Sequence, residues 1–139
     1  MTLKSSPYIS FPGNAAEAFA FYHEVFGGDL KVMGYEGIDV PFTPPPGAVA
    51  HAELNAEGVS LTGGDAIGED LPPVESGVYS LLLGPQTIEE GAALREKLMA
   101  DGGTEAMPFG VAPWGDWYGQ VKDRFGVLWQ IAVAMPEQG

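Results

Sequence analysis

The sequence contains no cysteine and few basic residues. Without cysteine, the chain forms no disulfide bonds and no thiolate zinc sites, and it offers no thiol nucleophile. Such a chain suits the reducing cytosol, so we expect a cytoplasmic protein. Six lysines and arginines against 19 acidic residues give a formal net charge of −13. This charge repels phosphate backbones and anionic lipids, so it argues against nucleic-acid and membrane partners.

Long apolar runs are also missing. The N-terminal segment MTLKSSPYISF has no apolar signal-peptide core, and no stretch is long enough to span a bilayer. Apolar residues still make up 45% of the 139 residues, which is enough to bury a core. The 20 glycines and 12 prolines favour many turns and loops over a helical bundle. We therefore expect one domain over residues 1–139.

The first half of the chain has the pattern of a strand, a helix and three further strands. Residues 8–11 are β-prone, and Asn14 follows as a predicted helix cap, with Glu17 at the capping-box position. Gly27 is expected to end this helix. The three strands after it are predicted over residues 30–35, 48–56 and 59–62.

The same order recurs after a predicted polar linker over residues 63–77. Thr87 and Glu90 form a capping-box pair for a second helix, which Gly102 is expected to end. The strands around this helix are predicted over residues 78–83, 105–109, 117–122 and 127–134.

The repetition indicates a duplicated unit. The helix-ending glycines 27 and 102 are 75 residues apart, and the turn glycines 58 and 126 are 68 apart. A nearly constant offset favours duplication of a βαβββ module. We expect an α+β fold of two such modules, at about residues 6–64 and 76–135, whose curled mixed sheets enclose a cavity.

Several segments resemble a known family. They are PYISFPGNAAEA (residues 7–18), FYHEVFGG (21–28), HAEL (51–54), WGDWYGQVKDRFG (114–126) and Trp129. Together they look like the PhnB-like branch of the vicinal oxygen chelate superfamily, which includes glyoxalase I, extradiol dioxygenases, fosfomycin-modifying enzymes and bleomycin resistance proteins. The resemblance implies paired βαβββ modules in a homodimer, with cavities built by both modules. Because this fold serves many chemistries, function depends on the site.

The resemblance also allows a test for a metal site. The superfamily's metal enzymes place His, Glu or Gln ligands on the concave side of the first and last strands of each module. Counted from the helix motif and the glycine turns, these positions fall at Pro7, at Ser60 or Thr62, at Val78 and at Gln130. Gln130 is the one good ligand among them, and one ligand does not make a metal site. No metal or other cofactor is expected; a divalent metal is the alternative.

Two candidate catalytic residues lie in the predicted third strand. His51 and Glu53 alternate with Ala52 and Leu54. If Leu54 faces the helix, the two polar side chains face the cavity or solvent. A histidine near a carboxylate suits acid–base catalysis, and an exposed strand face is the alternative reading.

Other residues are candidates for lining a ligand cavity. They are Ser60, Thr62, Trp114, Trp117, Tyr118 and Gln130. The aromatic members suit a flat or apolar ligand, and they suit a dimer interface equally well. Asp123 is expected to bond the backbone of its own turn, and Trp129 to pack beneath the helices.

These observations predict a metal-independent protein of the bleomycin-resistance kind that binds a small organic molecule. The alternative is a metal-dependent lyase, isomerase or dioxygenase with a centre around His51, Glu53 and Gln130. A third hypothesis is a methyltransferase, because the PhnB-like branch has carried a demethylubiquinone-methyltransferase label. The sequence does not support it, since no glycine-rich cofactor motif follows a strand.

Overall fold

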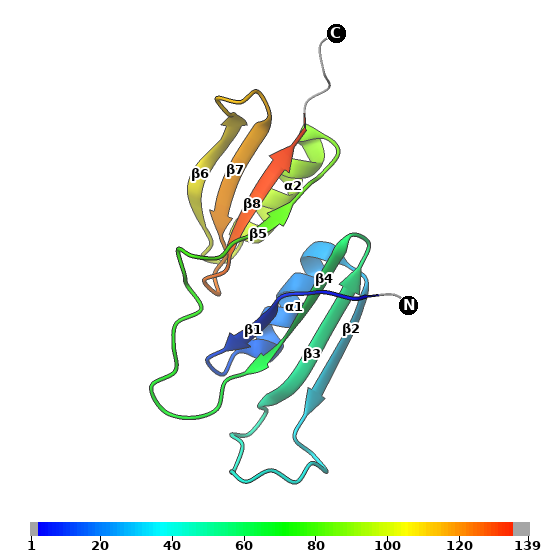
Figure 1. Cartoon of the computed structure of the whole chain (residues 1–139), viewed down its shortest axis with the longest axis vertical. Coiled ribbons are helices and arrows are strands. Elements are labelled where there is room, and N and C mark those ends of the chain that lie inside the picture. The colour runs from blue at the N-terminus through cyan, green and yellow to red at the C-terminus, as the bar shows by residue number, and fades with distance from the viewer. Residues whose placement is uncertain (1–2, 135–139) are drawn as a thin grey trace. The chain divides into compact units, whose positions relative to one another are not determined.

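A computed structural model describes residues 3–134 of the chain. They divide into two compact units, one ending at Val74 and the other beginning at Glu75. Each unit holds one helix and one four-stranded mixed sheet (Figure 1). The predicted α+β fold of two βαβββ modules is therefore confirmed, and enclosure of a cavity stays a prediction.

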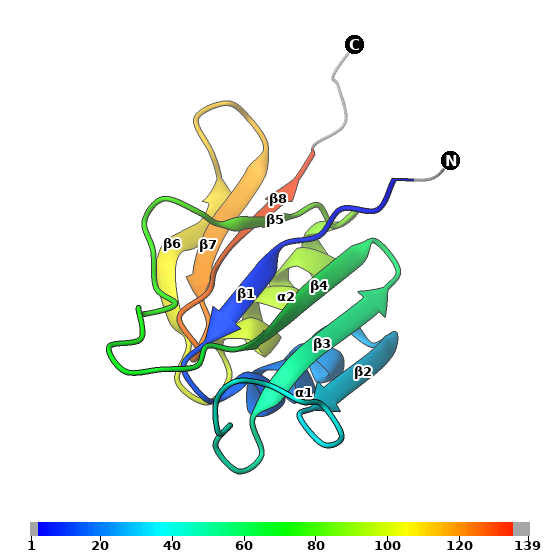
Figure 2. The ribbon, with the colours of Figure 1, turned by 60° about the horizontal axis from the view of Figure 1, so that its bottom comes forward.

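The first unit follows the predicted order. Its elements are β1 (Tyr8–Phe11), α1 (Ala15–Phe26), β2 (Asp29–Gly34), β3 (Val49–Ala56) and β4 (Val59–Asp65). The sheet has the order β1-β4-β3-β2, as Figure 2 shows. Strand β1 runs parallel to β4, and the other pairs are antiparallel. The loop between β2 and β3 contains the three consecutive prolines.

The second unit repeats this topology. Its elements are β5 (Leu81–Leu83), α2 (Ile88–Met99), β6 (Thr104–Val111), β7 (Trp117–Lys122) and β8 (Leu128–Val133). The sheet order is β5-β8-β7-β6, with β5 parallel to β8 and antiparallel pairs elsewhere. The repeat seen in the sequence is thus present in the strand pairing.

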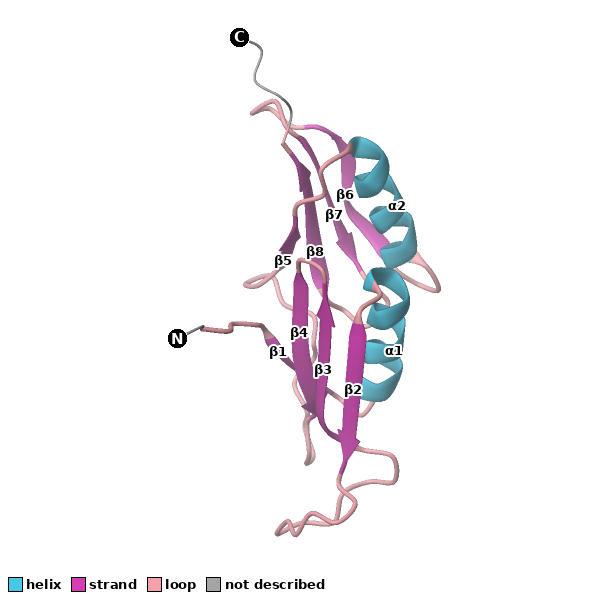
Figure 3. Ribbon diagram, turned by 90° about the vertical axis from the view of Figure 1, so that its right-hand side faces the viewer, coloured by secondary structure: helices cyan, strands magenta, loops and turns pink. Residues whose placement is uncertain are grey.

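In each unit the helix covers one face of the sheet (Figure 3). Alternation along the strands decides which side chains lie beneath it. In β3, Ala52 and Leu54 are fully buried, whereas His51 and Glu53 are partly exposed, as the sequence predicted. In β8, Trp129 and Ile131 are buried while Gln130 between them is not. The face of each sheet opposite its own helix is called the open face below.

Besides shifts of one or two residues at other strand ends, three predicted boundaries are wrong for a physical reason. Strand β4 runs on to Asp65, so residues 63–65 are not linker; a Cβ on Gly63 would lie 2.5 Å from the Ile9 carbonyl oxygen, which explains a glycine in this strand. Strand β5 begins at Leu81, since the pairing with β8 covers only three residues. Helix α2 ends at Met99, before Gly102, because Ala100 leaves the helical conformation.

The two helices begin in different ways. Thr87 caps α2 as predicted: its hydroxyl accepts the Glu90 N–H at 3.1 Å, and the Glu90 carboxylate accepts the Gln86 N–H at 2.9 Å. The prediction that Asn14 caps α1 is wrong, because its side chain makes no capping bond. Asp65 instead accepts the Ala15 N–H at 2.8 Å. A carboxylate from the end of β4 thus replaces the local cap. Neither described helix combines the length and apolar character needed to cross a bilayer.

Candidate functional site

A chain of hydrogen bonds crosses the open face of the second sheet. The Tyr118 hydroxyl donates to Oε1 of Gln130 at 2.7 Å and accepts from Nε2 of Gln120 at 2.7 Å. Nε2 of Gln130 donates to the Ser80 hydroxyl, also at 2.7 Å. We call these four residues the polar network. All of its members are uncharged, so it suits a ligand recognised by hydrogen bonds and not by charge.

Strand register brings the polar network together. Gln120 and Gln130 are paired across β7 and β8. Leu82 of β5 is paired with Gln130 on the other side, and 67% of its surface is exposed. The open face therefore places an apolar side chain beside a hydrogen-bonding centre, which is the usual composition of a small-molecule site.

The predicted aromatic residues do not share one face. The Trp114 ring meets the Tyr118 ring edge to face, with centroids 5.2 Å apart, and extends the polar network with an exposed indole. Trp117 lies on the helix-facing side of β7, where its ring meets Phe109 with centroids 5.9 Å apart. Adjacent residues of a regular strand point to opposite faces, and that alternation already separates Trp117 from Tyr118 in the sequence.

The open face of the first sheet carries the other candidates. The Thr62 hydroxyl donates to the Pro7 carbonyl oxygen at 2.7 Å and lies 3.0 Å from the Ser6 hydroxyl. Ser60 donates to Oδ1 of Asn55 over a longer 3.4 Å. Both hydroxyls are therefore hydrogen-bonded, Ser60 within the sheet and Thr62 to the segment that precedes β1.

The structure brings His51 and Glu53 together on this same face. Nε2 of His51 lies 3.9 Å from Oε1 of Glu53, and the two side chains are 43% and 40% exposed. The Tyr8 ring stacks on the imidazole, with centroids 5.9 Å apart. Solvent screens an ion pair this exposed, which limits its strength to below about 1 kcal/mol. Tyr8 was missed as a neighbour, although the predicted first strand places it within reach of such a face.

A family model described as 3-demethylubiquinone-9 3-methyltransferase matches residues 3–132. The chain belongs to this family. Protein YjdN of Escherichia coli strain K12 is 34% identical over 143 residues, covering 92% of this chain and 93% of YjdN. These matches confirm the resemblance to the PhnB-like branch that the sequence motifs indicated.

Solved structures agree with this membership. Protein PA1353 of Pseudomonas aeruginosa is 31% identical, with a TM-score of 0.79 over 97% of this chain and 100% of that one. The PhnB protein of Bacillus cereus is 27% identical, with a TM-score of 0.75 over 95% and 100%. More distant structures, described as glyoxalase-related or as members of the glyoxalase/bleomycin resistance protein/dioxygenase superfamily, share the fold.

Members of this superfamily that use a metal need several good ligands, and the four counted positions do not supply them. Pro7 offers only its carbonyl, which Thr62 already occupies. Val78 precedes β5, so the residue paired with Gln130 is Leu82. Both ends of the Gln130 amide are hydrogen-bonded within the polar network. Within residues 3–134, no three His, Asp or Glu side chains gather as a metal site would require. This donor set does not fit a divalent cation.

Proposed function

We propose that the chain is a small-molecule-binding protein of the glyoxalase/bleomycin-resistance type, which holds an uncharged organic ligand against the open face of the second sheet without a metal. The polar network is the observation that carries this proposal. In it the Tyr118 hydroxyl both donates and accepts, which fixes the orientations of Gln120 and Gln130. Side chains that are held in place lose little entropy when a ligand binds.

The groups left over in the network define what the ligand offers. The Gln120 amide donates through its nitrogen, which leaves its oxygen as an acceptor, and the Ser80 hydroxyl accepts from Gln130, which leaves its proton to donate. Trp114 and Leu82 add exposed apolar surface at the two sides. A flat ligand with one donor and one acceptor, such as an aromatic amide or a phenol, matches this arrangement.

The cellular setting forms part of the same proposal. We infer a cytoplasmic homodimer, as the superfamily resemblance implies. Methyl transfer is left out of the proposal, because the sequence has no glycine-rich motif between a strand and a helix to hold a nucleotide-like cofactor.

A metal-dependent lyase, isomerase or dioxygenase is the second candidate. The contact between His51 and Glu53, with Tyr8 stacked on the imidazole, favours it, because these groups can transfer a proton. His51 is the residue whose replacement separates the two candidates.

The test is a thermal-shift screen of aromatic amides and phenols, followed by calorimetric titration of the compounds that stabilise the protein. We expect Tyr118→Phe to weaken them about five-fold, the value of one hydrogen bond of about 1 kcal/mol. Tyr8→Phe makes the same chemical change on the other open face and is expected to leave their affinity unchanged.

The same screen can also contradict the proposal. Stabilisation by nickel, manganese or iron but by no organic compound would reject the proposal. If protein purified without chelator also contained stoichiometric metal, and His51→Ala lost it, the metal-dependent candidate would replace it.

A further inference from the structure

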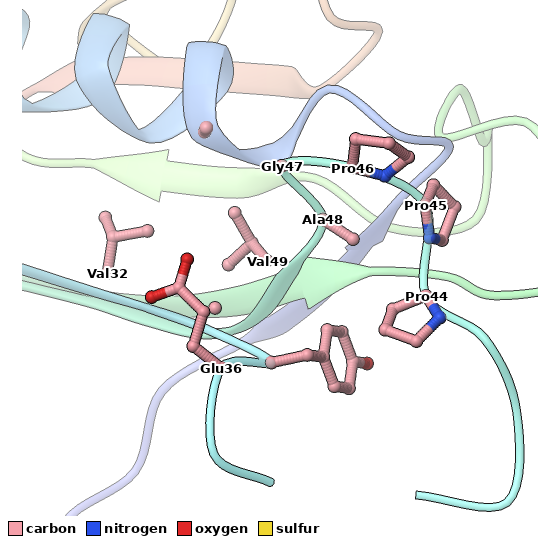
Figure 4. Close-up of a pocket in the computed structure, with 11 residues that line it drawn as sticks. Val32, Glu36, Pro44, Pro45, Pro46, Gly47, Ala48 and Val49 are labelled. Atoms are coloured by element: carbon pink, nitrogen blue, oxygen red, sulfur yellow. The ribbon is translucent and has the colours of Figure 1, made fainter.

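A hollow of about 490 Å³ lies in the first unit, between the proline-rich loop and the neighbouring ends of β2, β3 and α1 (Figure 4). It is lined by Ala16, Val32, Gly34, Tyr35, Glu36, Pro44, Pro45, Pro46, Gly47, Ala48 and Val49. This volume lies within the range of small-molecule sites. The hollow belongs to the helix-facing side of the sheet, because Val32 is paired with the buried Ala52.

The side of this hollow formed by the proline-rich loop has few free hydrogen-bond donors. Its three prolines have no N–H. The Ala48 N–H donates to the Pro45 carbonyl at 3.1 Å, and the Val49 N–H donates to Asp65 at 2.8 Å. On the loop side, the three prolines and these two paired amides leave mainly apolar surface and acceptor oxygens. A ligand that fits it brings an apolar body and its own donors or positive charge.

The charge of the hollow comes from Glu36. In Figure 4 the Glu36 carboxylate points into the space beside Val32 and Val49. None of the ion pairs among residues 3–134 involves Glu36. Lys31 is the basic residue nearest along β2, but it precedes Val32 and therefore points to the open face, where it is paired with Glu53.

The positive end of α1 also reaches the hollow at Ala16, and a carboxylate offsets it. Asp65 accepts the Ala15 N–H there, so a negative charge already faces the N-terminal dipole of the helix. The net electrostatics therefore stay acidic. The first unit as a whole has two lysines and no arginine up to residue 74, within a chain of net charge −13.

The loop beside the hollow is restricted in its backbone conformation. Pro44, Pro45 and Pro46 fix three successive φ angles. The Tyr35 ring meets the Phe42 ring edge to face, with centroids 5.5 Å apart, and so braces the loop against the end of β2. Tyr35 also lines the hollow, where an aromatic ring attracts a cation.

We propose that this hollow binds a small organic cation with an apolar body, such as an arylammonium or alkylammonium ion. The apolar part packs on Val32, Val49 and the prolines, and the ammonium group faces Glu36. The strongly acidic chain raises the local concentration of such cations. The site is separate from the polar network, so this inference goes beyond the proposed function and does not depend on it.

The test is an NMR titration of the full-length, isotope-labelled protein with benzyltrimethylammonium, with benzyl alcohol as the neutral comparison and phenylacetate as the anionic one. We expect amide shifts at Val32, Glu36 and Val49, tightest binding for the cation, and weaker binding of the cation as sodium chloride is added. Shifts that appear instead around Tyr118 and Gln130 would reject this site and leave the proposed function standing.

Three variants separate charge from shape. Glu36→Gln is expected to weaken the cation about two- to five-fold, as for a solvent-exposed ion pair, and to leave benzyl alcohol unchanged. Glu57→Gln removes the same charge at the β3–β4 turn and serves as the matched control. Ala16→Leu adds side-chain volume at the wall of the hollow and is expected to weaken both compounds, while leucine remains a good helix former at this position. Equal affinities for cation and alcohol, or an unchanged cation affinity in Glu36→Gln, would overturn the proposal.

Discussion

Asp123 acts as a clamp on its own turn and on a tryptophan further along the chain. Asp123 is only 3% exposed, and it accepts the N–H groups of Phe125 at 2.9 Å and Val127 at 3.1 Å. It also accepts the Trp129 indole N–H at 2.9 Å. The local bonds confirm the turn role predicted from the sequence. The indole bond anchors a fully buried tryptophan. The sequence did not predict this bond, which became apparent only in the folded turn.

Replacing Asp123 tests this clamp. In Asp123→Asn, an NH₂ group replaces one of the two carboxylate oxygens, and an NH₂ group cannot accept a hydrogen bond. At least one of the three N–H donors therefore loses its acceptor. We expect the free energy of unfolding to fall by about 2 kcal/mol, the scale of a buried hydrogen bond to a charged group. Urea denaturation followed by tryptophan fluorescence measures it. A variant as stable as the parent would show that the turn holds without the carboxylate.

The helices show how much local sequence decides at the scale of an element. Both have a cap residue followed three positions later by glutamate, and α2 uses that pair as predicted. In α1 the Asn14 side-chain oxygen is buried without a hydrogen-bond partner among the described residues. The same local signal therefore has two outcomes, because Asp65 reaches the start of α1 from 50 residues away.

The two cap positions predict losses of different size for the same kind of substitution. Thr87→Ala is expected to destabilise the protein by about 1 kcal/mol, because it removes the acceptor for the Glu90 N–H. Asn14→Ala is expected to cost less than about 0.5 kcal/mol, since no capping bond is lost. Thermal unfolding followed by circular dichroism compares the two variants. Equal losses would mean that Asn14 caps α1 in solution.

The alternation of side chains along the strands predicted more about the candidate site residues than the sequence motifs did. Alternation correctly separated Leu54 from His51 and Glu53, and it also places Trp117 and Tyr118 on opposite faces. Strand β5 was harder to predict, because the run from Val78 to Leu83 is apolar apart from Ser80, while only its last three residues find partners in β8. A strand extends only as far as its residues pair with a neighbouring strand, and this pairing depends on residues that are distant in the sequence.

At the scale of the whole molecule, the prediction of a single domain and a homodimer can be tested with one substitution. All three tryptophans lie after residue 75, in the second unit. Asp65→Ala removes a carboxylate that accepts two backbone N–H bonds in the first unit. If the units unfold together, this change lowers the midpoint of the tryptophan fluorescence transition, although every reporter lies in the other unit.

The same experiment, repeated at two protein concentrations, examines the dimer. A homodimer that dissociates on unfolding has a midpoint that rises with concentration. Circular dichroism recorded in parallel is the control, because it reports both units. An early transition seen by circular dichroism alone would mean that the units unfold independently, and a midpoint that does not depend on concentration would argue against the dimer.

The order of elements, the duplication and the family could be predicted from the amino-acid sequence, because hydrophobic periodicity, glycine turns and motif spacing are all local or repeat along the chain. The sequence also predicted which side of β3 is buried. The folded chain was needed to show that Asp65 caps α1, that Gly63 belongs in a strand, and that Tyr118, Gln130 and Ser80 form one network. Each of these features joins residues that are far apart in the chain. Strand pairing and packing bring those residues together, and the local sequence around each of them does not show which partner it will meet.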